Sequence, residues 1–349
     1  METKKLKTAF LGITEKDQGL LEAAWKNKLF DVVALAGGNP DLITSFAGRY
    51  ECNAFDDYRQ LIVRNELDLL VVTAPIHLCE EHVRAAMKKK FNILKLAPPA
   101  LDFEQTAELM QIAQKNKVKF FVANPMLFCP AFAELPKHLQ TQDKNEIHLV
   151  SAFCNTPTRL DEPSRRWLND PKLAGGGVLL RDCYYIIDLV ILNFGLPQQV
   201  YCLVTNQAPD KQQRLSITED TVALLMKFSD TLIGSLVGSR RFGPPSAGLT
   251  IHGKQSYIAF TNDGFATYDN SGTIIQQQKC DYSPEECIKK MLQNVALAML
   301  QPDKKQTDAR TRNIMNMAVI EAAYLSARTA MPEEPLKVLE MAANAPTHI

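Results

Sequence analysis

The stretch FNILKLAPPAL, residues 91–101, predicts a short buried strand that runs into a Pro-Pro turn. A helical pattern over residues 80–90 precedes this stretch, and a second helix over 103–115 and a strand over 117–123 follow it. Helices and strands therefore alternate on both sides of the stretch. Such alternation is typical of right-handed βαβ units, in which the strands form a parallel sheet.

The same alternation extends toward the N-terminus. Apolar strands are expected over residues 8–12, 30–37 and 69–74, with helices between them over 20–26 and 41–50. Strands that are apolar on both faces are typical of parallel sheets covered by helices. We therefore expect an α/β, Rossmann-like dinucleotide-binding-type domain over residues 1–127.

The pattern changes after Pro130. A long polar loop that ends in three glycines, residues 175–177, leads into an apolar helix over 178–194. Between residues 198 and 278 short strands follow one another, separated in places by turn signals, which is typical of an antiparallel sheet. We expect an α+β domain over residues 128–349, built on an open, mostly antiparallel sheet. Its other predicted elements are a helix over 131–141, a strand over 146–154 and closing helices over 284–300 and 308–328.

The composition is that of an ordinary globular protein. Of the 349 residues, 46% are hydrophobic and 22% are charged, and Lys plus Arg equals Asp plus Glu at 39 each. No basic stripe indicates a nucleic-acid partner, and no apolar run approaches the ~18 residues of a membrane span. The eight cysteines contain no Cys-x-x-Cys pair, and the six histidines have no ligand spacing. We therefore expect reduced thiols, a cytoplasmic protein and no metal site.

Several short motifs occur in a characteristic order. The sequence WLNDPKLAGGGVL at residues 167–179 is followed by Asp-Leu at 188–189 and Gly-Leu-Pro at 195–197, and Asn-Pro-Asp at 39–41 and Pro-Ile-His at 75–77 lie upstream. With the two predicted domains, these motifs resemble the glucose-fructose oxidoreductase and inositol dehydrogenase family (Gfo/Idh/MocA). The resemblance spans nearly the whole chain. It implies NAD or NADP as the cofactor and a sugar, polyol or related small molecule as the substrate.

The phosphate loop of this family differs here. Its sequence is similar to Gly-x-Gly-x-x-Gly, whereas this chain has Gly12 followed by Thr14 and Asp17. The second glycine of the motif lets the backbone approach a pyrophosphate, and the side chain of Thr14 obstructs that approach. Carboxylates at Glu15 and Asp17 would also repel phosphates at the helix N-terminus. The alternative reading is structural, because Thr14-x-x-Asp17 matches an N-cap with an acid in the first turn.

The ribose and nicotinamide positions differ as well. Where the family has an acidic residue that holds the adenosine ribose, this chain has Gly37, and Gly38 follows where an NADP-specific enzyme carries Arg. After the third strand, the family's Pro-Asn becomes Pro75-Ile76, so an amide that could face the nicotinamide is lost. His77 is either a cofactor contact or a solvated loop residue. By position, the candidate cofactor-binding residues are Gly12, Thr14, Pro75 and His77.

The lysine of the family's Glu-Lys-Pro triplet is also absent, because the chain has Leu96-Ala97-Pro98. In the family this lysine donates or orients a proton, and Ala97 can do neither. Loss of such a group typically costs a factor of about 10² to 10⁴ in rate. Lys95 points to the same face of the strand, ~6.5 Å back, and is the candidate replacement. The alternative is that Lys95 snorkels from the end of the sheet.

On the helix after the three glycines, the family's Asp and His become Arg181 and Tyr185. Arg181 cannot act as a base because it does not deprotonate. Tyr185 can donate a hydrogen bond and, with a depressed pKa, could act as a general acid. Its alternative role is a half-buried aromatic residue of an amphipathic helix. The candidate catalytic residues are Tyr185 and Lys95, and the candidate substrate-pocket residues are Arg181, Trp167 and Tyr184.

Five changed sites favour a degenerate family member that binds or scaffolds rather than catalyses. Arg181, Tyr185 and Lys95 would then line a cationic cleft for an anionic small molecule, because arginine binds carboxylate or phosphate bidentately. The alternative is an active, diverged NAD(P)-dependent dehydrogenase or reductase of a sugar or related small molecule.

The strand over residues 221–228 indicates contact with another subunit. Both of its faces are apolar, since Val222, Leu224 and Met226 alternate with Ala223, Leu225 and Lys227. Such a strand needs cover on both sides. We therefore expect a homo-oligomer through the C-terminal sheet, with a purely structural role in a mixed oligomer as a third functional possibility.

Overall fold

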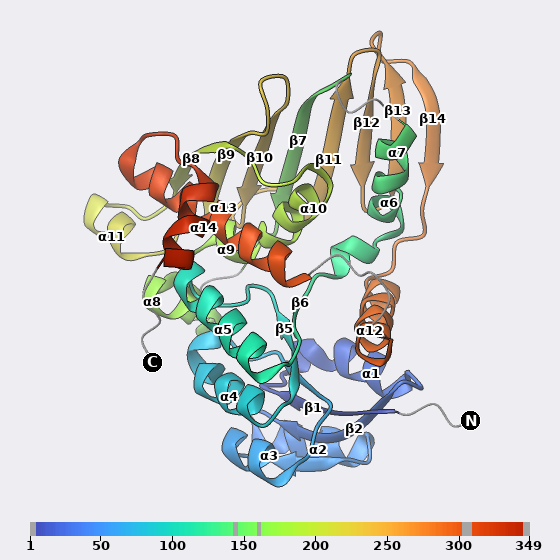
Figure 1. Ribbon diagram of the computed structural model, residues 1–349, viewed down its shortest axis with the longest axis vertical. Coiled ribbons are helices and arrows are strands. Elements are labelled where there is room, and N and C mark those ends of the chain that lie inside the picture. Colours follow the sequence, from blue (N-terminus) through green and yellow to red (C-terminus); the bar gives the residue numbers. More distant parts are fainter. Residues whose placement is uncertain (1–4, 142–145, 159–161, 302–308, 345–349) are drawn as a thin grey trace. The chain divides into compact units, whose positions relative to one another are not determined.

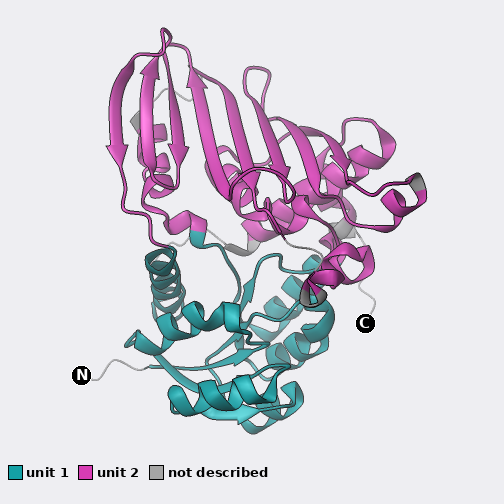
Figure 2. Ribbon diagram, turned by 180° about the vertical axis from the view of Figure 1, so that it is seen from behind, with its two compact units in different colours: residues 1–100, 105–125, 284–310 teal, residues 101–104, 126–283, 311–349 magenta. Residues whose placement is uncertain are grey.

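The computed structural model describes residues 5–141, 146–158, 162–301 and 309–344 (Figure 1). The chain forms two compact units, shown in different colours in Figure 2. Unit 1 comprises residues 1–100, 105–125 and 284–310, and unit 2 comprises residues 101–104, 126–283 and 311–349. Unit 1 thus includes a late segment, residues 284–310, which the sequence-based boundary at residue 127 places in the second domain. This segment contains α12 (Pro284–Leu300), which packs against α1 (Gln18–Lys26).

Within the described residues, unit 1 contains one sheet of six parallel strands in the order β3-β2-β1-β4-β5-β6. This is the strand order of a doubly wound dinucleotide-binding fold. Every residue of β4 is buried, as a central parallel strand covered on both faces requires. The predicted α/β class and parallel sheet are confirmed. The strands are β1 (Leu6–Leu11), β2 (Phe30–Ala36), β3 (Asn53–Phe55), β4 (Leu69–Val72), β5 (Asn92–Leu96) and β6 (Phe120–Ala123).

Helices connect the strands of unit 1 (Figure 1). Two short elements, β3 and α3, are absent from the sequence-based prediction. The reason for β3 is its length of three residues and its lack of a buried side chain, which leave no apolar run to recognise. Besides α1 and α12, the helices are α2 (Pro40–Arg49), α3 (Tyr58–Arg64), α4 (Ile76–Lys88) and α5 (Phe103–Asn116).

Unit 2 is built on an open sheet, in which eight strands of the described chain lie in the order β14-β13-β12-β11-β7-β10-β9-β8. Neighbours pair antiparallel, except for β7 and β10, which are parallel. The predicted open, mostly antiparallel sheet is confirmed. The strands are β7 (Ile147–Asn155), β8 (Gln199–Thr205), β9 (Thr221–Lys227), β10 (Ile233–Ser239), β11 (Ser246–Gly253), β12 (Ser256–Thr261), β13 (Gly264–Asp269) and β14 (Ile274–Lys279).

The helix predicted over residues 178–194 is interrupted. α9 (Val178–Arg181) ends where the N–H of Cys183 donates to the carbonyl of Val178 at 2.9 Å, a bond that spans five residues instead of four. Bonds of this kind are common where helices end. α10 (Tyr184–Phe194) begins directly after the interruption. The spacing of four residues predicts that Arg181 and Tyr185 share one face of a continuous helix. Because the helix is interrupted between them, they do not. The other helices of unit 2 are α6 (Pro130–Ala133), α7 (Leu135–Thr141), α8 (Pro171–Ala174), α11 (Lys211–Ser216), α13 (Ala309–Thr329) and α14 (Pro335–Asn344).

Candidate functional site

In unit 1 the loops after β1 and β4 meet at the carboxyl ends of these two neighbouring strands. Gly12 has φ +89°, and a Cβ at this position would lie 2.2 Å from the Cβ of Ala74. Only glycine fits such a close approach of two backbones. The crevice outside these strand ends is where open α/β sheets bind ligands. The fold therefore retains the place of a dinucleotide site, and Gly12 and the Ala74-Pro75 loop lie side by side there.

Two donors of Thr14, in the turn after β1, are bonded to the chain's own carboxylate of Asp17. Thr14 is exposed, its N–H donates to Asp17 Oδ2 at 2.9 Å, and its hydroxyl donates to the same oxygen at 2.7 Å. The predicted capping arrangement is present. A helix N-terminus binds anions through its free N–H groups and its dipole. In this loop the carboxylate of Asp17 takes the place of such an anion, because it accepts hydrogen bonds from Thr14.

Gly37, where the resemblance places the acid that binds the ribose, has no room for a side chain. A Cβ at Gly37 would lie 2.6 Å from the carbonyl oxygen of Ile13 and 2.7 Å from Cδ1 of Ile43. An acidic side chain cannot occupy this position without a shift of the backbone. Gly38, in contrast, faces open space. Asn39 next to it caps α2 by accepting a hydrogen bond from the N–H of Leu42 at 3.2 Å.

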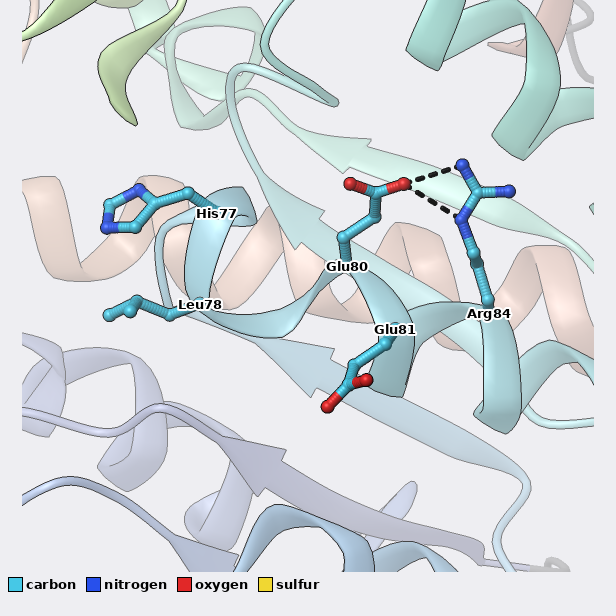
Figure 3. Close-up of a pocket in the computed structure, with 5 residues that line it drawn as sticks. All are labelled: His77, Leu78, Glu80, Glu81 and Arg84. Carbon is cyan, nitrogen blue, oxygen red and sulfur yellow. Dashed lines mark hydrogen bonds and ion pairs between the residues drawn. The ribbon is translucent and has the colours of Figure 1, made fainter. Parts of the chain in front are cut away.

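The first turns of α4 line a hollow of about 380 Å³ (Figure 3). Pro75 is the N-cap of α4, Ile76 is buried, and half-buried His77 lies on the first turn and lines the hollow. The arginine of the hollow, Arg84, is neutralised, because it donates to Glu80 at 2.6 Å and to Glu108 at 2.7 Å. A hollow with paired cationic and acidic side chains offers no unpaired positive charge to a phosphate. Its lining consists of His77, Leu78, Glu80, Glu81 and Arg84.

Lys95, the candidate replacement for the missing lysine, is in the interior of unit 1. Its side chain is 3% exposed, and its Nζ donates to the carbonyl of Leu96 at 2.9 Å. The snorkelling alternative is therefore wrong, because the ammonium group is not at the surface. Burial raises the pKa of the neighbouring Cys79 thiol to about 11, while the charge of Lys95 acts in the opposite direction.

In unit 2 the three glycines let the chain pack tightly against a buried carboxylate. A Cβ at Gly177 would lie 1.9 Å from the carbonyl oxygen of Glu219, and one at Gly176 would lie 2.1 Å from the hydroxyl of Tyr324. The carboxylate of Glu219 accepts hydrogen bonds from the N–H groups of Gly177 and Leu179 and from the hydroxyl of Tyr324, at 2.8, 3.0 and 2.9 Å. Burial raises the pKa of Glu219, whereas these bonds lower it. Glu219 thus caps the N-terminal end of α9, whose C-terminal end is formed by Arg181.

Arg181 lies at that C-terminal end and stacks on Trp167. The guanidinium carbon is 4.5 Å from the ring centroid of Trp167, and Nη1 donates to the carbonyl of Ala174 at 3.0 Å. In the described part of the chain Arg181 forms no ion pair with a carboxylate. Burial, together with the positive charge of Arg240, lowers the pKa of Arg181 to about 10. The predicted pocket residues Arg181 and Trp167 therefore form one cationic, aromatic surface.

Arg240 is a functional candidate that the sequence analysis missed. It follows the end of β10 and is 2% exposed, and its Nε and Nη2 donate to Asp182 Oδ2 at 3.2 and 2.8 Å. Its third nitrogen, Nη1, is buried and has no hydrogen-bond partner among the residues that the structure describes. The only sequence feature that points to Arg240 is the pair Arg240-Arg241 directly after an apolar strand. Nothing in the sequence shows that Asp182 is the partner of Arg240.

The two tyrosines after the helix interruption have different environments. Tyr185 is half-buried, and burial raises its pKa to about 12, so its phenol is protonated at neutral pH and can donate a hydrogen bond. The depressed pKa required of an efficient general acid is thus not found. Tyr184 is fully buried, and its hydroxyl donates to Asn313 on α13 at 3.3 Å. The assignment of Tyr184 to the substrate pocket is therefore wrong, because its ring is part of the core between α10 and α13.

The described residues contain no group of three or more His, Cys, Asp or Glu side chains that could hold a metal ion. None of the helices formed by these residues has the length and apolar character needed to cross a membrane.

A six-stranded parallel sheet in the dinucleotide-binding order, together with a large open sheet, defines the class of two-domain oxidoreductase folds. Two family models match the chain. The model of the oxidoreductase family with an NAD-binding Rossmann fold matches residues 6–124, and the GFO/IDH/MocA C-terminal domain matches residues 132–259. The chain belongs to the Gfo/Idh/MocA oxidoreductase family.

Similar proteins of known function act on sugars. The D-xylose 1-dehydrogenase (NADP(+)) 2 of Haloferax volcanii is 23% identical over 290 residues, which are 80% of this chain and 84% of that protein. The 2,7-anhydro-N-acetylneuraminate hydratase of Mediterraneibacter gnavus is 21% identical over 223 residues, 63% of this chain and 58% of that protein. Levoglucosan dehydrogenase, in complex with NADH and levoglucosan, superposes with a TM-score of 0.81 at 18% identity, covering 95% of this chain and 99% of its own. This structural likeness establishes the fold alone.

Proposed function

We propose that this chain is a family member that binds a small, anionic, sugar-like molecule on unit 2 and does not transfer hydride. The observation that carries the proposal is Arg181. It stands where the resemblance places an acidic residue, it is stacked on Trp167, and it has no ion-pair partner in the described part of the chain. A guanidinium in this environment suits a planar oxyanion, which can accept two parallel hydrogen bonds.

Unit 1 supports the absence of hydride transfer. A pyrophosphate at the first helix would meet the carboxylate of Asp17, which is bonded to the N–H of Thr14. Two like charges ~4 Å apart repel by roughly 1 kcal/mol in water and about 4 kcal/mol near a protein surface. Gly37 cannot carry a ribose-binding acid, and Ala97 cannot transfer a proton. Each change alone could be compensated, whereas their combination removes phosphate, ribose and proton-transfer contacts together.

A titration with NADH and with NADPH, followed by cofactor fluorescence, tests the proposal. We expect no saturable binding in the micromolar range, and no oxidation of neutral sugars with NAD or NADP. The variant that combines Asp17→Gly with Ala97→Lys, titrated in the same way, measures how much these two changes alone restore cofactor binding. Micromolar binding of either cofactor to the unmodified protein would contradict the proposal.

The second candidate function is an active, diverged NAD(P)-dependent dehydrogenase or reductase. Two observations favour it: residues 6–124 match a family model described as NAD-binding, and Tyr185 keeps its proton at neutral pH. Turnover of a sugar that Tyr185→Phe abolishes, with cofactor binding unchanged, would establish this function in place of the first.

We also propose that a second copy of the chain covers the open face of the sheet of unit 2. Val222, Leu224 and Met226 of β9 are buried, whereas Leu225 between them is 56% exposed. The register places exposed apolar residues in one row across β8, β9, β10 and β7, namely Leu203, Ala223, Val237 and Phe153. An exposed apolar patch of this kind is typical of an interface. Sedimentation velocity should show a dimer or larger assembly that Leu225→Glu dissociates, and a monomer in the unmodified protein would contradict this proposal.

The state of the eight cysteines indicates the cellular compartment of the protein. All eight are free thiols, and six of them are buried. We propose a cytoplasmic location, because free thiols persist in reducing compartments. Quantitative labelling of the unfolded protein, purified without reductant, should find eight thiols.

A further inference from the structure

A second feature of unit 2 lies at the carboxyl ends of β7 and β10, the parallel pair in its otherwise antiparallel sheet as far as the structure describes it. Ser239 pairs with Asn155, and the N–H of Thr156 donates to the carbonyl of Ser239 at 2.9 Å. The chain segments that leave both strands, including Thr156 and Arg240, therefore run side by side.

The interruption between α9 and α10 packs against the same strand ends. The thiol of Cys154 on β7 lies 3.5 Å from the carbonyl oxygen of Asp182. On β10, a Cβ at Gly238 would lie 2.4 Å from the sulfur of Cys183. Arg181 and Asp182 are thus held near Arg240, which is bonded to Asp182.

Two buried polar groups at this place lack a partner among the described residues: Nη1 of Arg240 and the hydroxyl of Thr156. Both groups can donate a hydrogen bond. A buried donor that is left unbonded costs free energy, and native proteins contain few of them. Two such donors on adjacent segments indicate an acceptor that the described residues do not supply.

The charges at this place determine the kind of acceptor. Arg181 and Arg240 contribute two positive charges, and Asp182 neutralises one of them. The carboxylate of Glu219 is taken up by three donors at the start of α9, and Arg241 is paired with Asp220. Among the described residues Arg181 therefore has no carboxylate paired with it, and one added carboxylate can accept hydrogen bonds from Arg181 and from both orphan donors. A phosphate dianion would add two negative charges beside the carboxylates of Asp182 and Glu219, which is more unfavourable in a buried site.

We propose that the strand ends of β7 and β10 bind the carboxylate of a sugar acid, with Arg181, Arg240 Nη1 and the Thr156 hydroxyl as its donors. This inference rests on the proposed small-molecule function of unit 2 and names the class of ligand. The stacked Trp167 extends the site by an aromatic surface on which the apolar face of a sugar ring can lie. A hydroxylated monocarboxylic acid therefore satisfies the charge, the orphan donors and the aromatic surface together.

Isothermal titration calorimetry tests this assignment on the full chain. The probes are D-glucuronate, D-galacturonate and D-gluconate, with D-glucose as the uncharged counterpart and D-glucose 6-phosphate as the dianionic one. We expect saturable binding of at least one sugar acid and weaker binding of the other two probes. Absence of binding by all three acids, or tighter binding of the phosphate, overturns the assignment.

Variants then locate the site. Arg181→Gln removes a charged donor and should weaken binding of the sugar acid by ~10- to 100-fold. Thr156→Val keeps the side-chain shape, removes one neutral hydrogen bond and should weaken binding by ~5-fold. Arg241→Gln is the matched control, since its guanidinium is paired with Asp220, and it should leave the affinity unchanged. Unchanged affinity in both Arg181→Gln and Thr156→Val, in variants that melt like the unmodified protein, overturns the assignment.

The outcome is separable from that of the proposed function. Binding of NADH together with a sugar acid would contradict the absence of hydride transfer and leave the carboxylate site in place. Absence of NADH binding together with absence of sugar-acid binding would instead support the absence of hydride transfer and overturn the carboxylate site.

Discussion

The strand ends of the two units differ in how their polar groups are satisfied. At the strand ends of unit 1, Asp17 accepts from Thr14, the ammonium of Lys95 donates to Leu96, and Arg84 is held by two glutamates. At the strand ends of unit 2, Arg181 has no ion-pair partner and Arg240 has an unbonded nitrogen, within the described residues. These three groups of unit 1 are bonded within the chain, whereas the two arginines of unit 2 still have donors to offer. This difference supports the proposal that unit 2 binds the anionic ligand.

The test with the largest expected effect compares one arginine of each unit that has an acidic partner. Arg240→Ala should lower the free energy of unfolding by about 3–5 kcal/mol, because it leaves Asp182 without its partner in a buried site. Arg84→Ala in unit 1 should cost only ~1 kcal/mol, because its glutamates are partly exposed to water. Urea unfolding of both variants measures the difference. Equal losses would show that the pair in unit 2 is as solvated as the pair in unit 1.

A second test concerns the closed ribose position of unit 1. Gly37→Asp should destabilise the protein by up to ~3 kcal/mol, because its Cβ would overlap the carbonyl of Ile13. Gly38→Asp, which faces open space, is the control and should change stability by less than ~0.5 kcal/mol. Thermal melts compare the two. A stable Gly37→Asp variant that binds NADH would show that this site is open.

A third test uses pH and one buried thiol from each unit. Burial raises the pKa of Cys79 in unit 1 to about 11 and that of Cys202 in unit 2 to about 12, from an ordinary value of 9.0. Above pH 9 the unfolded chain loses these protons while the folded chain keeps them. Stability should therefore be unaffected below pH 9 and fall as the pH rises through these shifted values.

Each unit of pKa shift corresponds to ~1.4 kcal/mol, so Cys79 alone accounts for a loss on the order of 2 kcal/mol near pH 11. Urea unfolding at pH 8, 9 and 10 under reducing conditions measures the slope. Cys79→Ala and Cys202→Ala should each make it shallower. Slopes identical to that of the unmodified protein would mean that both thiols ionise freely in the folded state.

The smallest expected effect is at the first helix. Asp17→Ala removes the acceptor of two hydrogen bonds from Thr14 and should cost ~1 kcal/mol, the usual value of a lost helix cap. It should not create NADH binding, because Gly37 and Ala97 are unchanged. Thermal melts and a fluorescence titration of the same variant check both statements. Micromolar binding of NADH by this variant would show that Asp17 alone closes the site.

Local spacing predicted most of unit 1 and one part of its site. The apolar runs gave the strands, and Thr14-x-x-Asp17 gave the cap, because both depend on residues close together in the chain. The short β3 gave no signal, since none of its three residues is buried. The interruption at Asp182 and Cys183 was also missed, because an apolar run alone does not reveal the bond from Cys183 to Val178.

In unit 2 the missed residues are those whose partners are far away in the sequence. Arg240 bonds to Asp182, 58 positions earlier, and Glu219 accepts from Tyr324, 105 positions later. Tyr184 was assigned to the pocket because it lies beside Tyr185, and the packing of α13 placed it in the core. Periodicity distinguishes the faces of a helix, but it does not tell which neighbour covers each face.

The sequence by itself determined most of the alternation of strands and helices and the family motifs, and it predicts the absence of the usual cofactor and proton-transfer side chains. These properties depend on residue type and on spacing along the chain. The tertiary structure alone decided which charges are neutralised, because pairing depends on distance in space. It brought Asp182 to Arg240, left Arg181 without an acidic partner in the described chain and closed Gly37 against Ile13.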